Sequence, residues 1–289
     1  RILKKMNAEV LKWNGNFYFV YLPSWTRYNN RYSEHIFLGN NYKNYKNANL
    51  NRSKIGIRNF KNIAVDKNFN IAINDYINFN INNEKKIIQL EQANWKGRAV
   101  IYKSDIDSWK IIFNNNNQNK NKFEITPDYQ NLTGCLTIID TFVKNLEIVA
   151  NNLMCEDGLN FIRSTGNLKN ISINNGLSDA LDADFSNLDF DYININKASN
   201  DCSDFSFGKY KINNASLKNC GDKSISVGEK SNLEVNLAEI SNSKEGIISK
   251  DSSEVFIKKG IFNNVEVCLG AYNKKQEFNG AQIRYINTN

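Results

Sequence analysis

A repeat of about 22 residues dominates this chain. Residues 157–184 read DGLNFIRSTGNLKNISINNGLSDALDAD, and the residues that follow repeat the same order of acidic, apolar and asparagine positions. Acidic side chains recur at intervals of 21 to 23 residues, at Asp157, Asp179, Asp201, Asp222, Glu245 and Glu266. A repeat of this length has to be identified before single elements are assigned, because it determines the architecture.

Two further columns keep the same period. The apolar column consists of Ile173, Ile195, Leu217, Ile240 and Phe262. Two residues later comes a column of Asn175, Lys197, Asn219, Asn242 and Asn264. We predict that Asn175, Asn219, Asn242 and Asn264 form a structural ladder at a turn, interrupted by Lys197, because stacked amide side chains hydrogen-bond to one another and to turn backbone.

The period predicts an all-β fold, a single-stranded right-handed parallel β-helix solenoid. About 22 residues suit one coil of two or three short strands, whereas the fixed consensus of leucine-rich repeats is missing and a propeller blade needs ~40 residues. Coils stacked ~4.8 Å apart bury a continuous apolar core that no single coil could bury alone. We assign the solenoid to residues 55–289, with the clearest coils at 130–285.

Residues 1–54 have a different pattern. Arg1–Trp13 is typical of an amphipathic helix, and Phe17–Leu22 is a continuous apolar run of the kind found in buried parallel strands. We therefore predict a short α/β segment and a connector before the solenoid. No apolar run in the sequence approaches the ~18 residues that cross a membrane.

Composition excludes several classes of protein. The 289 residues contain one histidine, which rules out sites that need two, and 41% hydrophobic residues, which indicates a globular chain. Residues 1–130 carry 21 lysines and arginines against 10 acidic residues, and residues 131–289 carry 16 against 20. No nucleic-acid-binding motif accompanies the basic half, so we expect a monomer with no nucleic-acid partner.

The five cysteines are Cys135, Cys155, Cys202, Cys220 and Cys268. Their odd number and irregular spacing match neither a disulfide framework nor a metal site, so we expect mostly buried free thiols. The chain begins with Arg1, and we expect it to be a fragment or a processed product, in which the absence of a signal peptide is uninformative.

Six blocks in order, EDGLNFIRS, SDALDADFSN, NDCSDFSFG, GDKSISVGEKS, GIISKDSSEV and LGAYNKKQEF, resemble the right-handed parallel β-helices of the pectin-lyase-like superfamily. They are most similar to the variety attached to spore-coat-protein-H-like modules of bacteria. This resemblance implies a carbohydrate-related role outside the cell or at its envelope. Residues 13–32, WNGNFYFVYLPSWTRYNNRY, resemble a strand region of SGNH-type hydrolases, but no histidine follows His35 to complete that family's Asp-x-x-His motif.

Alternation along the strands predicts an outward acidic cluster. Asp182 and Asp204 would lie one coil apart, about 5 Å, with Asp184 ~7 Å along the strand. Such a cluster could bind calcium, could supply general acid and base for cleaving an acidic glycan, or could be ordinary surface charge. No cofactor is required, and calcium is the one candidate. Lys223 is a candidate base, and the candidate substrate-binding residues are Arg163, Lys230, Lys250 and Tyr272.

Three functions remain open. The leading one is a bacterial β-helix that binds or displays carbohydrate at the cell envelope without catalysis. The second is a lyase, epimerase or hydrolase of acidic polysaccharide centred on Asp182, Asp184 and Asp204. It would lack the histidine that the resemblance implies for polygalacturonases and alginate epimerases. The third is a structural spacer.

Overall fold

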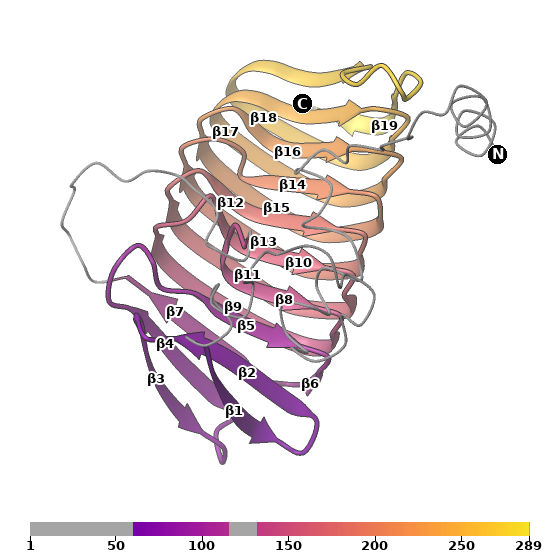
Figure 1. The fold of residues 1–289 in the computed structure, drawn as a ribbon. Helices are drawn as coiled ribbons and strands as arrows, with labels where there is room; N and C mark the ends of the chain where they lie inside the picture. Colours follow the sequence, from indigo (N-terminus) through magenta and orange to yellow (C-terminus); the bar gives the residue numbers. More distant parts are fainter. Residues whose placement is uncertain (1–59, 116–131, 289) are drawn as a thin grey trace, which may run out of the picture. The chain divides into compact units, whose positions relative to one another are not determined.

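The protein is a β-solenoid in which parallel strands stack coil upon coil (Figure 1). The structure, a computed structural model, describes residues 60–115 and 132–288, which contain strands and turns and no helix. The predicted α/β segment at 1–54 lies outside the described residues. Accordingly, the described residues contain no helix that could span a membrane.

Nineteen strands are formed by the described residues. They are β1 Phe60–Asp66, β2 Phe69–Asn74, β3 Ile77–Asn82, β4 Ile87–Gln92, β5 Ala99–Tyr102, β6 Asp105–Asp107, β7 Lys110–Asn114, β8 Gly134–Ile139, β9 Phe142–Leu153, β10 Asp157–Ile162, β11 Thr165–Gly176, β12 Asp179–Asp184, β13 Asn187–Ala198, β14 Ser203–Ser206, β15 Lys209–Cys220, β16 Lys223–Gly228, β17 Asn232–Lys250, β18 Glu254–Tyr272 and β19 Gln282–Thr288.

Each coil consists of one short and one long strand. The short strands β8, β10, β12, β14 and β16 pair in parallel and form what we call the short-strand sheet, which the ends of β17 and β18 continue. The long strands β9, β11, β13, β15, β17 and β18 stack in the same way. We call their second halves, which follow an irregularity near Asn170, the second-half sheet.

The predicted apolar column is confirmed. Ile173 pairs with Ile195, Ile195 with Leu217, Leu217 with Ile240, and Ile240 with Phe262. Ile173, Ile195, Leu217 and Ile240 are at most 2% exposed, and Phe262 packs on the same core from the last coils. Burial of such stacked side chains, at about 25 cal/mol per Å² of apolar surface, is the main force that holds one coil on the next.

Asparagines turn the chain where the second-half sheet ends, near the end of β9, β11 and β15 and within β17 and β18. Asn152, Asn175, Asn219, Asn242 and Asn264 all have φ between 53° and 68°, and Lys197 has φ of 73°. Asparagine tolerates this left-handed conformation better than most residues. The Nδ2 of Asn175 donates to Asn152 Oδ1 at 3.0 Å, and that of Asn264 donates to Asn242 Oδ1 at 2.9 Å. At the Lys197 interruption, Asn219 donates instead to Asn196 at 2.9 Å.

A second ladder, of hydroxyl groups, follows the short strands. The backbone N–H of Thr141 donates to Ser164 Oγ at 3.3 Å, and that of Ser164 donates to Ser186 Oγ at 3.0 Å. Farther along, the N–H of Ser231 donates to Ser253 Oγ at 3.1 Å. Each of these bonds satisfies a buried donor with a side chain of the next coil, so the ladder fixes the stacking distance at this bend.

One coil lacks the ladder hydroxyl, because Gly208 stands at its position. A Cβ at Gly208 would lie 2.4 Å from the hydroxyl of Tyr210, which therefore fills the space of a serine side chain. The N–H of Ser186 donates to this hydroxyl at 3.4 Å, and the hydroxyl donates to the carbonyl of Ala183 at 2.9 Å. The Gly208–Tyr210 pair thus replaces serine without breaking the ladder.

The first described strands do not follow the parallel pattern. β1 pairs with β2, β2 with β5, and β3 with β4, all antiparallel. Parallel stacking begins where β4 meets β7 and β5 meets β8. The first coils expected from residue 55 are therefore a set of antiparallel strands on the end of the solenoid, drawn in purple in Figure 1.

The expectation of free cysteines is wrong for four of the five. Cys135 is bonded to Cys155, and Cys202 to Cys220, whereas Cys268 is a free, exposed thiol. The separations of 20 and 18 residues are meaningless as a linear pattern. They are slightly less than one coil, however, and a solenoid brings residues one coil apart into contact.

The acidic column is also corrected. Asp157 pairs with Asp179 as expected, but Glu245 pairs with Lys223 on one side and with Val267 on the other. Asp222 and Glu266 therefore lie one residue before the column. Every step of this column from Asp157 to Val267 is 22 residues, so the intervals of 21 and 23 between acidic residues arise where an acid stands one residue off the register.

Candidate functional site

The structure places the predicted acidic residues side by side on the short-strand sheet. Asp182 pairs with Asp204 in the next coil, and Asp184 pairs with Ser206. Asn160, in the preceding coil, donates from Nδ2 to Asp157 at 3.0 Å and to Asp182 at 2.9 Å. The Asn160–Asp182 bond joins two neighbouring coils, and we call Asn160, Asp182, Asp184 and Asp204 together the acidic seam.

The prediction that this row faces solvent is wrong. Asp182 is 7% exposed, Asp184 5% and Asn160 1%, and only Asp204 is half-buried. All six residues of β8, β10 and β16 are buried, so both faces of the short-strand sheet are covered. A strand that is apolar on both faces, such as GCLTII in β8, carries this signal in its sequence.

The side chains of Lys223 and Arg163 are engaged by acids other than Asp182, Asp184 and Asp204. Lys223 is buried in the acidic column, ion-paired with Asp222 and 3.8 Å from Asp201 and 3.9 Å from Glu245. Arg163 makes a two-point contact with Asp140, with Nε 2.7 Å and Nη2 2.9 Å from its carboxylate oxygens. Both cations thus stabilise bends of the solenoid through charge-assisted hydrogen bonds.

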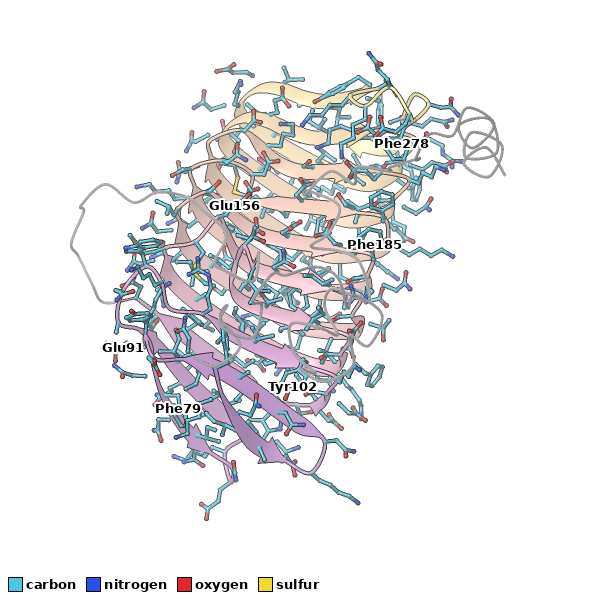
Figure 2. All side chains as sticks on the ribbon, in the orientation of Figure 1. Phe79, Glu91, Tyr102, Glu156, Phe185 and Phe278 are labelled. Atoms are coloured by element: carbon cyan, nitrogen blue, oxygen red, sulfur yellow. A yellow bond between two sulfur atoms is a disulfide. The ribbon has the colours of Figure 1, made fainter. Side chains whose placement is uncertain are left out.

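The other candidate residues lie toward the C-terminal end of the solenoid. Lys230 is exposed, with Nζ 5.8 Å from the centre of the Phe278 ring, which Figure 2 labels. Lys250 is 5% exposed and continues the row that runs from Asp184 through Ser206 and Gly228, and its charge partly offsets the rise that burial causes in the pKa of Asp201. Tyr272 pairs with Lys250 and is 40% exposed. Of these three residues, Lys250 is the one that the structure brings toward the acidic seam.

Metal-binding geometry is not found at the seam. Among residues 60–115 and 132–288, no group of three or more histidine, cysteine, aspartate or glutamate side chains is arranged to hold a metal ion. The calcium hypothesis therefore has no ligand cluster in this part of the chain.

Asp179 and Asp201 of the acidic column accept hydrogen bonds from the backbone of the next coil. Asp179 Oδ1 accepts the N–H of Asp201 at 2.9 Å, and Asp201 Oδ1 accepts the N–H of Lys223 at 2.9 Å. Burial, together with the neighbouring Asp201 and Asp157 charges, raises the pKa of Asp179 to about 7. Burial and the Asp204 charge raise the pKa of Asp201 to about 6. This column is a ladder of structural hydrogen bonds whose buried carboxylates repel one another when they are ionised.

A second surface lies on the outer side of the second-half sheet. In β11, β13 and β15 the inward isoleucines, leucine and alanine alternate with polar outward residues. We call this surface the amide face. Its central outward residues are Asn170, Ser172, Asn174, Tyr192, Asn194, Asn196, Asn214, Ser216 and Lys218.

Tyr192 is the aromatic centre of the amide face. It is 57% exposed and pairs with Asn214 in the next coil. Asn194 pairs with Ser172 on one side and with Ser216 on the other. An exposed tyrosine surrounded by amides and hydroxyls offers an apolar ring plane together with hydrogen-bond donors and acceptors.

A pocket of about 330 Å³ opens at the N-terminal end of the solenoid. It is lined by Asn78, Phe79, Asn80, Gln89, Leu90, Glu91 and Asn114, from β3, β4 and the end of β7. Phe79 is 38% exposed, and Figure 2 labels it beside Glu91 on the purple strands. The pocket thus combines one partly exposed ring with several amide groups.

Comparisons with models of protein families, with curated proteins and with solved structures found no match for this chain.

Proposed function

We propose that this chain is a bacterial β-helix protein of the pectin-lyase-like kind that binds carbohydrate at the cell envelope without catalysing a reaction on it. The observation that carries the proposal is the amide face, where Tyr192 is 57% exposed among asparagine and serine side chains. Sugars present both a C–H face that packs on aromatic rings and hydroxyls that pair with amides, so this surface offers what they need.

The acidic seam gives less support to an enzyme. Asp182 and Asp184 are buried, and Lys223 and Arg163 are engaged in ion pairs elsewhere. A general acid or base must reach the substrate within hydrogen-bond distance. We therefore assign the function to the amide face rather than to the seam.

The two disulfides support a location outside the cytoplasm. Cys135–Cys155 and Cys202–Cys220 would persist in an oxidising compartment, whereas cytosolic thiols are kept reduced. Disulfide-closed coils are suited to a protein displayed at the envelope, where its polysaccharide partners occur.

Binding to polysaccharides tests this proposal. The full chain would be assayed by affinity electrophoresis against soluble neutral and acidic polysaccharides. Tyr192→Ala should weaken binding at least tenfold, about 1.4 kcal/mol. The matched control is Tyr285→Ala, since Tyr285 is 59% exposed but lies on β19, away from the amide face.

Two outcomes would contradict the proposal. Failure of the chain to retain any polysaccharide would favour the spacer function. Equal loss of binding in both tyrosine variants would mean that the amide face is not the binding surface.

A further inference from the structure

The amide face contains an unbroken row of asparagines across four coils. Asn114 pairs with Asn151, Asn151 with Asn174, and Asn174 with Asn196. Asn151 donates to Asn114 Oδ1 at 2.8 Å, and Asn196 donates to Asn174 Oδ1 at 3.2 Å. Each side-chain amide has two donor hydrogens and two acceptor lone pairs, so these mutual bonds leave capacity for a ligand.

This row leads directly into the pocket. Asn114 lines the pocket and pairs with Glu91 of β4, which in turn pairs with Asn78 of β3. Strands are ~4.8 Å apart, so the five steps from Asn196 to Asn78 span about 24 Å. Tyr192 lies four residues before Asn196 on the same strand, about 13 Å along it, so the exposed ring and the pocket mark the two ends of a polar track that crosses the coils obliquely.

The track carries no cation among its described residues. Of the nine outward residues on β11, β13 and β15, only Lys218 is ionised, and it lies beyond Asn196. The one ionised step of the track itself is Glu91 at the pocket, whose negative charge would repel a uronate. A polyuronate would bring one carboxylate per sugar onto this surface, where desolvating each charge without a cationic partner is costly. A neutral chain would exchange its hydroxyl–water bonds for bonds to amides at little cost.

We propose that the ligand is a neutral, extended polysaccharide that crosses the coils obliquely, with one sugar on Tyr192 and the chain running over the asparagine row into the pocket. This inference rests on the proposed function and adds to it the class of glycan and the direction of the chain. The direction follows from the asymmetry of the row, which is asparagine at every step from Asn196 to Asn114 at the pocket, whereas beyond Asn196 it continues through Lys218 and Ser241 to Asn263.

The charge of the glycan is tested with one backbone in two forms. A neutral β-glucan and the same glucan oxidised to the uronate at C6 would be compared by calorimetry with the full chain. We expect the neutral form to bind at least tenfold more tightly. Equal or tighter binding of the uronate, with Tyr192 still required, would refute this inference while leaving the proposed function intact.

The direction is tested with oligosaccharides of increasing length. Replacing both Asn78 and Asn80 by alanine should weaken binding of oligomers long enough to span the 24 Å track by several-fold, and should not change binding of short ones. The control is Asn263→Ala, because Asn263 is exposed on the same row but on the other side of Tyr192.

A loss with Asn263→Ala but not with the pocket variant would show that the chain runs the opposite way. No effect of either variant at any length would also overturn the inference. Failure of the proposed function itself would look different, because then no oligomer would bind even to the unmodified protein. Circular dichroism would check that both variants keep the β-solenoid.

Discussion

Asp179 tests how much an ionised carboxylate in the acidic column costs the folded protein in free energy. Its carboxylate is largely buried between Asp157 and Asp201, and it accepts hydrogen bonds from the Asp201 N–H at 2.9 Å and from Asn200 Nδ2 at 2.7 Å. Asparagine has the same shape and keeps an oxygen acceptor for both bonds. Asp179→Asn therefore removes the charge and little else.

The pKa of Asp179 gives the size of the effect. Burial raises this pKa from the ordinary 3.8 to about 7. Each unit corresponds to about 1.36 kcal/mol, so the ionised carboxylate costs the folded state at most about 4 kcal/mol. Because the pKa of Asp179 is higher in the folded state than in the unfolded state, the protonated carboxyl favours folding. This contribution to stability is fully present below pH ~4 and is lost as the pH rises to about 7. The pKa of Asp201, about 6, acts in the same direction between pH ~4 and 6.

Urea unfolding of the full chain at pH 4 and at pH 8 measures this difference. We expect Asp179→Asn to match the unmodified protein at pH 4 and to be more stable by up to about 4 kcal/mol at pH 8. The control is Asp189→Asn, at an exposed position on β13. A variant that is less stable at pH 8 would refute the reasoning, since it would show that the ladder needs the charge.

Three further predictions concern the ladders and the disulfides. Replacing Cys202 and Cys220 together by serine should lower the free energy of unfolding by about 3 kcal/mol, because the disulfide closes a loop with a sequence separation of 18. Urea titration measures this loss, and a reductant should destabilise the variant less than it destabilises the unmodified protein. Tyr210→Phe should cost about 1–3 kcal/mol by leaving buried groups unpaired, whereas Tyr192→Phe should be neutral, and equal losses would contradict the hydroxyl-ladder assignment. Lys197→Asn should stabilise the protein by about 0.5–1 kcal/mol, visible as a higher thermal midpoint, because φ of 73° suits asparagine; a lower midpoint would count against the predicted asparagine ladder.

Repeat spacing was sufficient to predict the fold. The column from Ile173 to Phe262 has the register expected from counting, and Asp182 pairs with Asp204 as the alternation requires. Inward positions are constrained because each must fit the residue above and below. Their pattern is therefore repeated in the sequence.

The candidate site was harder to predict, because alternation shows which side of a strand a residue occupies but not whether that side is covered. Asp182 lies on the outward side as predicted and is nevertheless only 7% exposed. The hydroxyl ladder left a signal that spacing alone could have found, since Ser164 and Ser186 recur at the coil period. Tyr210 could not have been found in this way, because its hydroxyl acts from a different position in the coil.

Strand pairing joins each parallel coil only to the coils before and after it, which has a mechanical consequence for the two disulfides. A solenoid of this kind can lose coils one at a time from an end, because most of the stability of each coil comes from its nearest neighbours. Cys135–Cys155 and Cys202–Cys220 each close the coil they lie in, so separation of coils that advances from either end meets a covalent ring before it reaches the middle. The coils between the two rings, which carry the Tyr192 surface, would thus be the last part of the molecule to come apart under heat or tension.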